Sequence, residues 1–192
     1  MGNSIETKII GDYKIKIYPD TCPSDPRGGD NLGTMVCFHS RYNLGDKHGY
    51  RHADYSGWDQ LLKQIDRDHN VAVILPLYLY DHSGITMNTT GFSCPWDSGM
   101  VGLIFISKKK VRKEFGCKYI TKKVREYITE YLTGEVKTYD RYLTGDVYGY
   151  KITKKGEEVD SCWGFYGQEK CMETGESIVE YYINKVKEEV IA

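Results

Sequence analysis

The chain has 192 residues, of which 40% are hydrophobic and 28% are charged, and its formal net charge is −1. A chain of this length and composition can bury a substantial core in one domain, which excludes intrinsic disorder. No stretch approaches the roughly 20 apolar residues needed to span a bilayer, so we expect no membrane partner.

The N-terminus and the cysteines both indicate the cytoplasm. Residues 1–10, MGNSIETKII, lack the basic and apolar regions of a secretory signal. Six cysteines are spread along the chain without a C-x-x-C pair, which favours reduced thiols over a disulfide framework or a zinc ribbon. We therefore expect a cytoplasmic protein without a cofactor or a metal site.

Hydrophobic periodicity in the first part of the chain predicts four strands and one helix. Residues 12–18 alternate apolar and polar side chains, which is typical of a strand with one buried face. Apolar residues at helical spacing predict a helix at about 57–68. Further strands are expected at 34–40, 71–80 and 100–107, the last two apolar on both faces as central strands are.

The remaining sequence predicts three helices and a hairpin. Thr121 can cap a helix that ends at Gly134, and a short helix is expected to end at Gly145. The next strands form a hairpin that turns at Lys155, because the apolar periodicity breaks there at a Lys-Gly pair. An amphipathic pattern then predicts a closing helix at 173–192.

Strands and helices in this mixed order favour the α+β class. We expect a mainly antiparallel sheet with helices packed on it, formed by residues 1–192 as a single domain. Residues 1–11 are set apart as a segment that could be flexible.

Residues 80–99, which join the two predicted central strands, concentrate side chains capable of chemistry. Connections longer than about 12–15 residues are usually functional or disordered. Here His82 can act as a general base, with aspartates as orienting carboxylates or metal ligands and His39 or Cys94 assisting. The alternative is that these polar groups only hold turn amides, since no defined catalytic motif is present. The candidate catalytic set is His39, Asp81, His82, Cys94 and Asp97.

Residues 108–125 form a basic run. Nine Lys and Arg stand against one acid, so the run carries +8 and the rest of the chain −9. Such a face could bind phosphates by displacing counterions, or it could be a solvated surface balanced by the acidic C-terminal third. The run lacks the aromatic interleaving of a platform for single strands. The candidate binding residues are Lys108, Lys109, Lys110, Arg112, Lys113, Lys122, Lys123 and Arg125.

The stretches 30–46, 75–102, 142–150 and 160–167 resemble a family of small proteins encoded by bacteriophages and prophages of Gram-positive bacteria. The sequence departs from that family at Gly91, where a proline is expected. The resemblance carries no activity, but it implies an accessory protein in the host cytoplasm. By analogy it implies an inhibitor of a host nucleic-acid defence, of the anti-CRISPR or anti-restriction type.

Two hypotheses follow. In the first, the protein acts by binding, and the run 108–125 contacts a host protein, a protein–nucleic acid complex or nucleic acid itself. In the second, it is a small hydrolase or nuclease with a site around His82 and Cys94. The 17 tyrosines suit an interface and no catalytic motif is intact, so the first hypothesis is favoured and the oligomeric state stays open.

Overall fold

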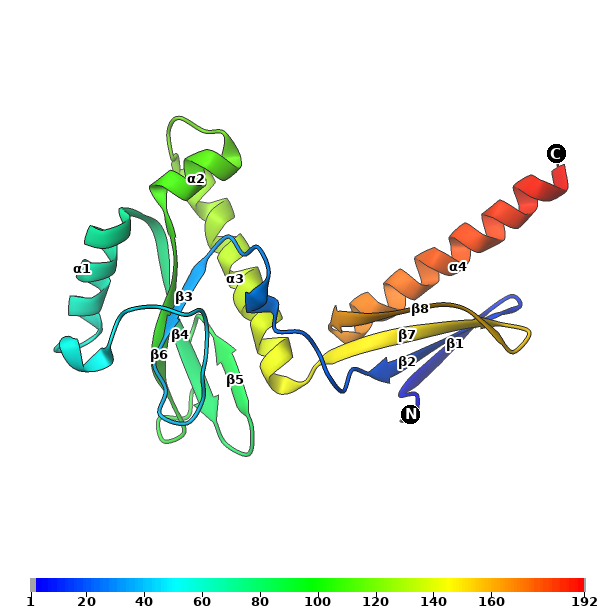
Figure 1. Ribbon diagram of the computed structural model, residues 1–192, viewed down its shortest axis with the longest axis horizontal. Helices are drawn as coiled ribbons and strands as arrows, with labels where there is room; N and C mark the ends of the chain where they lie inside the picture. Colours follow the sequence, from blue (N-terminus) through cyan, green and yellow to red (C-terminus); the bar gives the residue numbers. More distant parts are fainter. Residues whose placement is uncertain (1–2, 192) are drawn as a thin grey trace. The chain divides into compact units, whose positions relative to one another are not determined.

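The computed structural model describes residues 3–191, in which four α-helices accompany two four-stranded antiparallel sheets (Figure 1). The predicted α+β class with antiparallel strands is confirmed. Where one sheet was expected there are two, and the chain divides into two compact units. We call residues Pro26–Asp140 the central unit, and Met1–Asp25 with Arg141–Ala192 the terminal unit.

The sheet of the central unit has the strand order β3-β6-β4-β5. Its strands are β3 (Thr34–Cys37), β4 (Val71–Asp81), β5 (Ile85–Asn88) and β6 (Ser98–Ser107). The two predicted central strands are confirmed as β4 and β6, which pair directly with each other. The long connection between them contains β5, which extends the sheet beside the end of β4.

The central sheet lies between helices on its two faces (Figure 1). Leu61 of α1 packs with Leu103 of β6 on one face. Ile104, the next strand residue, points to the other face, where Leu132 of α3 approaches so closely that Gly33 has no room for a Cβ atom. The helices of this unit are α1 (Trp58–His69), α2 (Lys108–Phe115) and α3 (Lys122–Thr144), with 3-10 turns at Pro26–Gly28 and His52–Asp54.

Helix α3 corrects the prediction of two separate helices in this region. Thr121 caps it as expected, since its Oγ1 accepts a hydrogen bond of 3.3 Å from the first turn. Gly134 does not end it, because Leu132 and Val136 are buried at continuous helical spacing. That burial outweighs the cost of about 1 kcal/mol for a glycine inside a helix. The helix ends before Gly145, whose φ of +74° is left-handed, as predicted.

Periodicity does not predict helix α2, because its short sequence KKKVRKEF is mostly charged. Ser107 caps it, with Oγ accepting a hydrogen bond of 3.1 Å from the amide of Lys110. Gly116, with φ +58°, ends it. Val111 is its buried residue, so one apolar side chain fixes a helix whose other faces are mostly charged.

The terminal unit is a four-stranded meander with one helix. Its strands, in the sheet order β1-β2-β7-β8, are β1 (Glu6–Ile10), β2 (Tyr13–Pro19), β7 (Val147–Lys154) and β8 (Glu157–Tyr166), and its helix is α4 (Gln168–Ile191). The hairpin at Lys155 is confirmed. Residues 6–10, in the segment that could be flexible, form a strand because each of these residues pairs with a residue of β2. Helix α4 begins before the predicted residue 173. Residues 1, 2 and 192 of the predicted segments lie outside the described part of the chain.

The core of the terminal unit lies between its sheet and α4. Ile15 and Ile152 of the strands are fully buried with Val179 of the helix. Tyr13 stacks on Tyr182 with ring centroids 6.0 Å apart. The helix is therefore held by apolar burial along the face that α4 covers. In neither unit, within residues 3–191, is any helix long and apolar enough to cross a bilayer.

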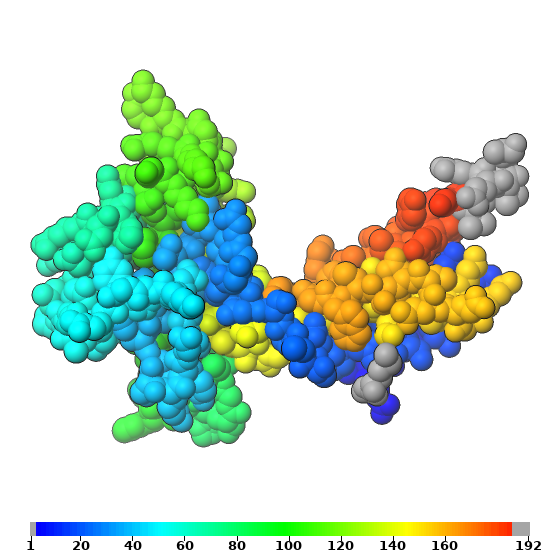
Figure 2. Space-filling model, viewed as in Figure 1, coloured from blue at the N-terminus to red at the C-terminus, as the bar shows by residue number. Residues whose placement is uncertain are grey.

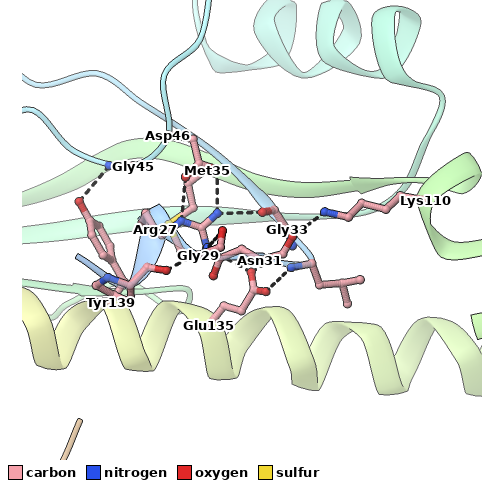
Figure 3. A network of polar contacts seen from close by, with 12 residues as sticks. Arg27, Gly29, Asn31, Gly33, Met35, Gly45, Asp46, Lys110, Glu135 and Tyr139 are labelled. Carbon is pink, nitrogen blue, oxygen red and sulfur yellow. Dashed lines mark hydrogen bonds and ion pairs between the residues drawn. The ribbon is translucent and has the colours of Figure 1, made fainter. Parts of the chain in front are cut away.

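A buried arginine holds the central unit together (Figure 3). Only 3% of the Arg27 side chain is exposed. Its guanidinium makes two hydrogen bonds to Asp46, of 2.8 and 2.7 Å, and approaches Glu135 at 3.2 Å. Burial opposes the charge, but the bonds and charges of Asp46 and Glu135 outweigh it and raise the pKa of Arg27.

The two carboxylates also bind backbone amides. Glu135 of α3 accepts hydrogen bonds from Leu32 (2.5 Å) and Gly33 (3.0 Å), and Asp46 accepts one of 2.8 Å from Met35. The carbonyl of Gly33 accepts a further bond of 2.8 Å from Arg27. The loop before β3, the strand itself and helix α3 are thus joined by one network.

Replacing Arg27 with Met should destabilise the protein by about 3 kcal/mol, because two partly buried carboxylates would remain without their cation. Urea denaturation followed by circular dichroism measures this loss. Arg67, an exposed arginine on α1, is the matched control, and Arg67→Met should change stability by less than about 0.5 kcal/mol. Equal small effects of both substitutions would show that the network contributes little.

Candidate functional site

The candidate catalytic residues all lie at one end of the central sheet. Strand β4 ends where β6 begins, and the amide of Asp81 donates a hydrogen bond of 2.8 Å to the carbonyl of Asp97. His39 follows β3, whose last residue pairs with Gly102 of β6 near the same end. The candidate residues therefore come together at one end of the sheet, but they form two separate groups of side chains.

The first group consists of His39 and Asp81, whose polar atoms contact neighbouring protein groups. Nδ1 of His39 accepts hydrogen bonds from the amides of Arg41 (3.2 Å) and Tyr42 (3.3 Å), so the proton of the neutral ring is on Nε2. Nε2 lies 3.7 Å from Asp81, and the guanidinium of Arg41 also binds that carboxylate. With Nδ1 bound to two turn amides and the Asp81 carboxylate paired with Arg41, His39 is a turn-capping residue.

The second group centres on Asp97. Its carboxylate lies 3.3 Å from Nδ1 of His82 and accepts a weak hydrogen bond of 3.8 Å from the thiol of Cys94. His82 is 63% exposed, and no hydrogen bond joins it to Cys94 among the described residues. This arrangement is an Asp-oriented histidine at the surface, in which Asp97 separates the two residues of the predicted Cys-His pair.

The surroundings of these groups limit what they can do. An open cavity of about 520 Å³ adjoins the sheet end, and His39 is the one candidate among its lining residues, which include Phe38, Tyr42 and His52. Within residues 3–191, no cluster of three or more His, Cys, Asp or Glu could hold a metal ion. The five candidate residues therefore do not share that cavity.

Two of the six thiols are too poorly ionised to act as nucleophiles. Burial, and then the charge of Asp46, raises the pKa of Cys37 to about 12. Burial, and then Cys162, raises the pKa of Cys171 to about 12. The thiolate is the reactive form, so neither group attacks a substrate at neutral pH.

The basic run divides into structural and exposed cations. Three of the predicted residues bind the protein itself: Lys108 donates to Asn70 (2.7 Å), Lys110 to the carbonyl of Asn31 (2.5 Å), and Arg125 to the carbonyl of Ala72. The other five are exposed, together with Lys118, which the candidate set omitted. The exposed cations are Lys109, Arg112, Lys113, Lys118, Lys122 and Lys123.

Two exposed tyrosines accompany these cations, one within the run 108–125 and one just after it. Tyr119 is 72% exposed, and the ammonium of Lys118 lies 5.6 Å from its ring centre. Tyr127 is half exposed and meets Phe115 edge to face. We call the six exposed cations, Tyr119 and Tyr127 the basic tip; this part of the central unit is green and projects in Figure 2.

The burial of the thiols predicts a graded reactivity. At pH 8, a disulfide reagent should modify the exposed Cys22 and Cys162 quickly, whereas Cys37 and Cys171 should react only after unfolding. Mass spectrometry of digested samples measures each site, and the urea-unfolded protein is the control for intrinsic reactivity. Modification of native Cys37 at the rate of Cys22 would contradict this assignment.

Comparisons with known proteins were made at three levels. The scan against protein-family models, the search of curated proteins and the search of solved structures each found no match. The function of the chain therefore has to be inferred from the geometry and charge of the residues described above.

Proposed function

We propose that the protein acts by binding, and that the basic tip contacts the phosphates of nucleic acid, either free or within a host nucleoprotein complex. The observation that carries this proposal is the excess of exposed cations at the tip. Six cations face two carboxylates, Glu114 and Glu126, each 3.7 Å from a lysine, so four positive charges are in excess. Exposed ion pairs of this kind are weak and leave the cations available.

The anchoring of the tip supports the same function. Lys110 and Arg125 bind backbone carbonyls elsewhere in the central unit, so the helices that carry the exposed cations are fixed to the sheet and its loops. A fixed array of cations binds a polyanion with a smaller loss of conformational entropy than flexible side chains on a mobile loop. Tyr119 and Tyr127 add ring surface on which an unpaired base can stack.

The resemblance to phage and prophage proteins suggests a setting for this binding. In that setting the protein is an accessory factor in the host cytoplasm that occupies the nucleic-acid site, or the bound nucleic acid, of a defence complex. An inhibitor of the anti-CRISPR or anti-restriction type is the form of the proposal that this resemblance favours.

Charge reversal at the tip should weaken binding. The triple variant Lys109→Glu, Arg112→Glu and Lys122→Glu should lower affinity for a labelled DNA at least tenfold. The slope of log affinity against log salt should also fall by about 2.7 for a duplex, because each phosphate contact contributes about 0.9. Fluorescence anisotropy at several salt concentrations measures both quantities.

A matched control carries the same total charge change elsewhere on the central unit. Lys63, Arg67 and Lys137 are exposed and lie outside the tip, and their reversal to Glu should leave the salt slope close to that of the wild type. Equal losses in the two triple variants would mean that only net charge matters. No measurable affinity of the wild type for DNA or RNA would overturn the proposal of a nucleic-acid ligand.

A second candidate function, a small hydrolase or nuclease, rests on the contact between His82 and Asp97. The carboxylate binds Nδ1 and leaves Nε2 of an exposed ring able to accept a proton from water. If the protein cleaves nucleic acid, His82→Ala should lower the rate at least a hundredfold, while His52→Ala, at another exposed histidine, should leave it unchanged. Cleavage that persists in His82→Ala would remove this candidate.

A further inference from the structure

The sheet of the terminal unit has a second face, which carries lysines and aromatic side chains instead of the apolar core residues. Within residues 3–25 and 141–191, helix α4 packs on the face that buries Ile15 and Ile152 (Figure 1). Successive strand residues point to opposite faces, so the side chains between the buried ones form the other face. We call it the lysine face; it comprises Thr7, Ile9, Lys14, Lys16, Tyr18, Gly149, Lys151, Thr153, Glu158, Ser161 and Trp163.

Two aromatic rings lie side by side on this face. The ring centroids of Tyr18 and Trp163 are 6.3 Å apart. The indole rests directly on Gly149, where any Cβ atom would clash with it, so the absence of a side chain at this position seats the ring against the sheet. Trp163 is nevertheless 45% exposed, which leaves ring surface available to a planar ligand.

The cations beside these rings are incompletely balanced. Lys16 and Lys151 are directly opposite each other on neighbouring strands, and like charges in this position destabilise a sheet. Glu158 binds Lys151 at 2.8 Å, but no ion pair is formed by Lys14 or Lys16 within the described residues. Two positive charges therefore remain in excess next to the exposed ring of Trp163 and the partly buried ring of Tyr18.

We propose that the lysine face binds single-stranded nucleic acid. Phosphates would neutralise Lys14 and Lys16, and an unpaired base would stack on Trp163. Both features are needed for this assignment: a duplex offers phosphates but keeps its bases stacked inside, whereas a single strand offers phosphates and free base faces. The proposal does not depend on the basic tip, because all of these residues belong to the terminal unit.

The experiment compares a labelled oligothymidine of 15 nucleotides with a duplex of equal length, using the full chain and fluorescence anisotropy. Trp163→Ala should lower affinity for the single strand by about 5- to 150-fold, the range for loss of one stacked base, with little effect on the duplex. Trp163→Phe should retain most of the affinity. Lys14→Glu with Lys16→Glu should lower the salt slope for the single strand by about 1.4.

Two controls separate this site from the basic tip and from a loss of folding. Trp96 is 91% exposed in the central unit, and Trp96→Ala should change neither affinity. The triple variant of the tip should have a lower affinity for both the single strand and the duplex, but it should still prefer the single strand. Far-UV circular dichroism identifies any unfolded variant, and the lysine variant then tests the site independently of Trp163.

Defined outcomes overturn the proposal. An unchanged ratio of single-strand to duplex affinity in Trp163→Ala, or an unchanged salt slope in the double lysine variant, would show that this face does not bind nucleic acid. A change of oligomeric state in either variant, measured by size-exclusion chromatography with light scattering, would instead assign the face to contact between copies of the chain.

Discussion

The ion pair of Arg27 with Asp46 and Glu135 is the interaction on which the central unit depends. A buried guanidinium is tolerable only with its charge and donors satisfied, and here two carboxylates and a carbonyl do so. The same loop carries Asn31, whose carbonyl accepts a hydrogen bond from Lys110 of α2. The support of the basic tip is thus continuous with the buried network.

Charged and polar side chains in this protein fall into two classes, those that bind other groups of the fold and those that are left exposed. Lysines and arginines of the basic run that reach a backbone carbonyl hold the fold, and those without such a partner form the exposed excess of charge. The histidines follow the same rule: Nδ1 of His39 accepts hydrogen bonds from two turn amides, whereas the ring of His82 is mostly exposed and lies 3.3 Å from the Asp97 carboxylate. The groups that the fold leaves without an internal partner are therefore the ones available for binding or chemistry.

Much of the framework could be predicted from periodicity, because strands β2, β4 and β6 and helix α1 have strong apolar patterns. The convergence of His39, His82 and Asp97 could also be anticipated, since each stands at a strand end. The division of these residues into two groups could not be anticipated. It depends on strand register and on the contact of Arg41 with Asp81, and no sequence pattern pointed to Arg41. Gly134 misled the prediction because local propensity is weaker than burial.

The sequence by itself determined the α+β class, the position of the main strands and the density of cations at 108–125, since these depend on local order along the chain. Tertiary structure decided the rest. The whole central unit lies between strands β2 and β7 in the sequence, yet the two strands pair with each other. This long-range pairing creates the second sheet and its lysine face. Arg27 lies in a segment without apolar periodicity, and only the approach of Asp46 and Glu135 allows its side chain to be buried, because burial of a charge requires partners, and these are distant in sequence.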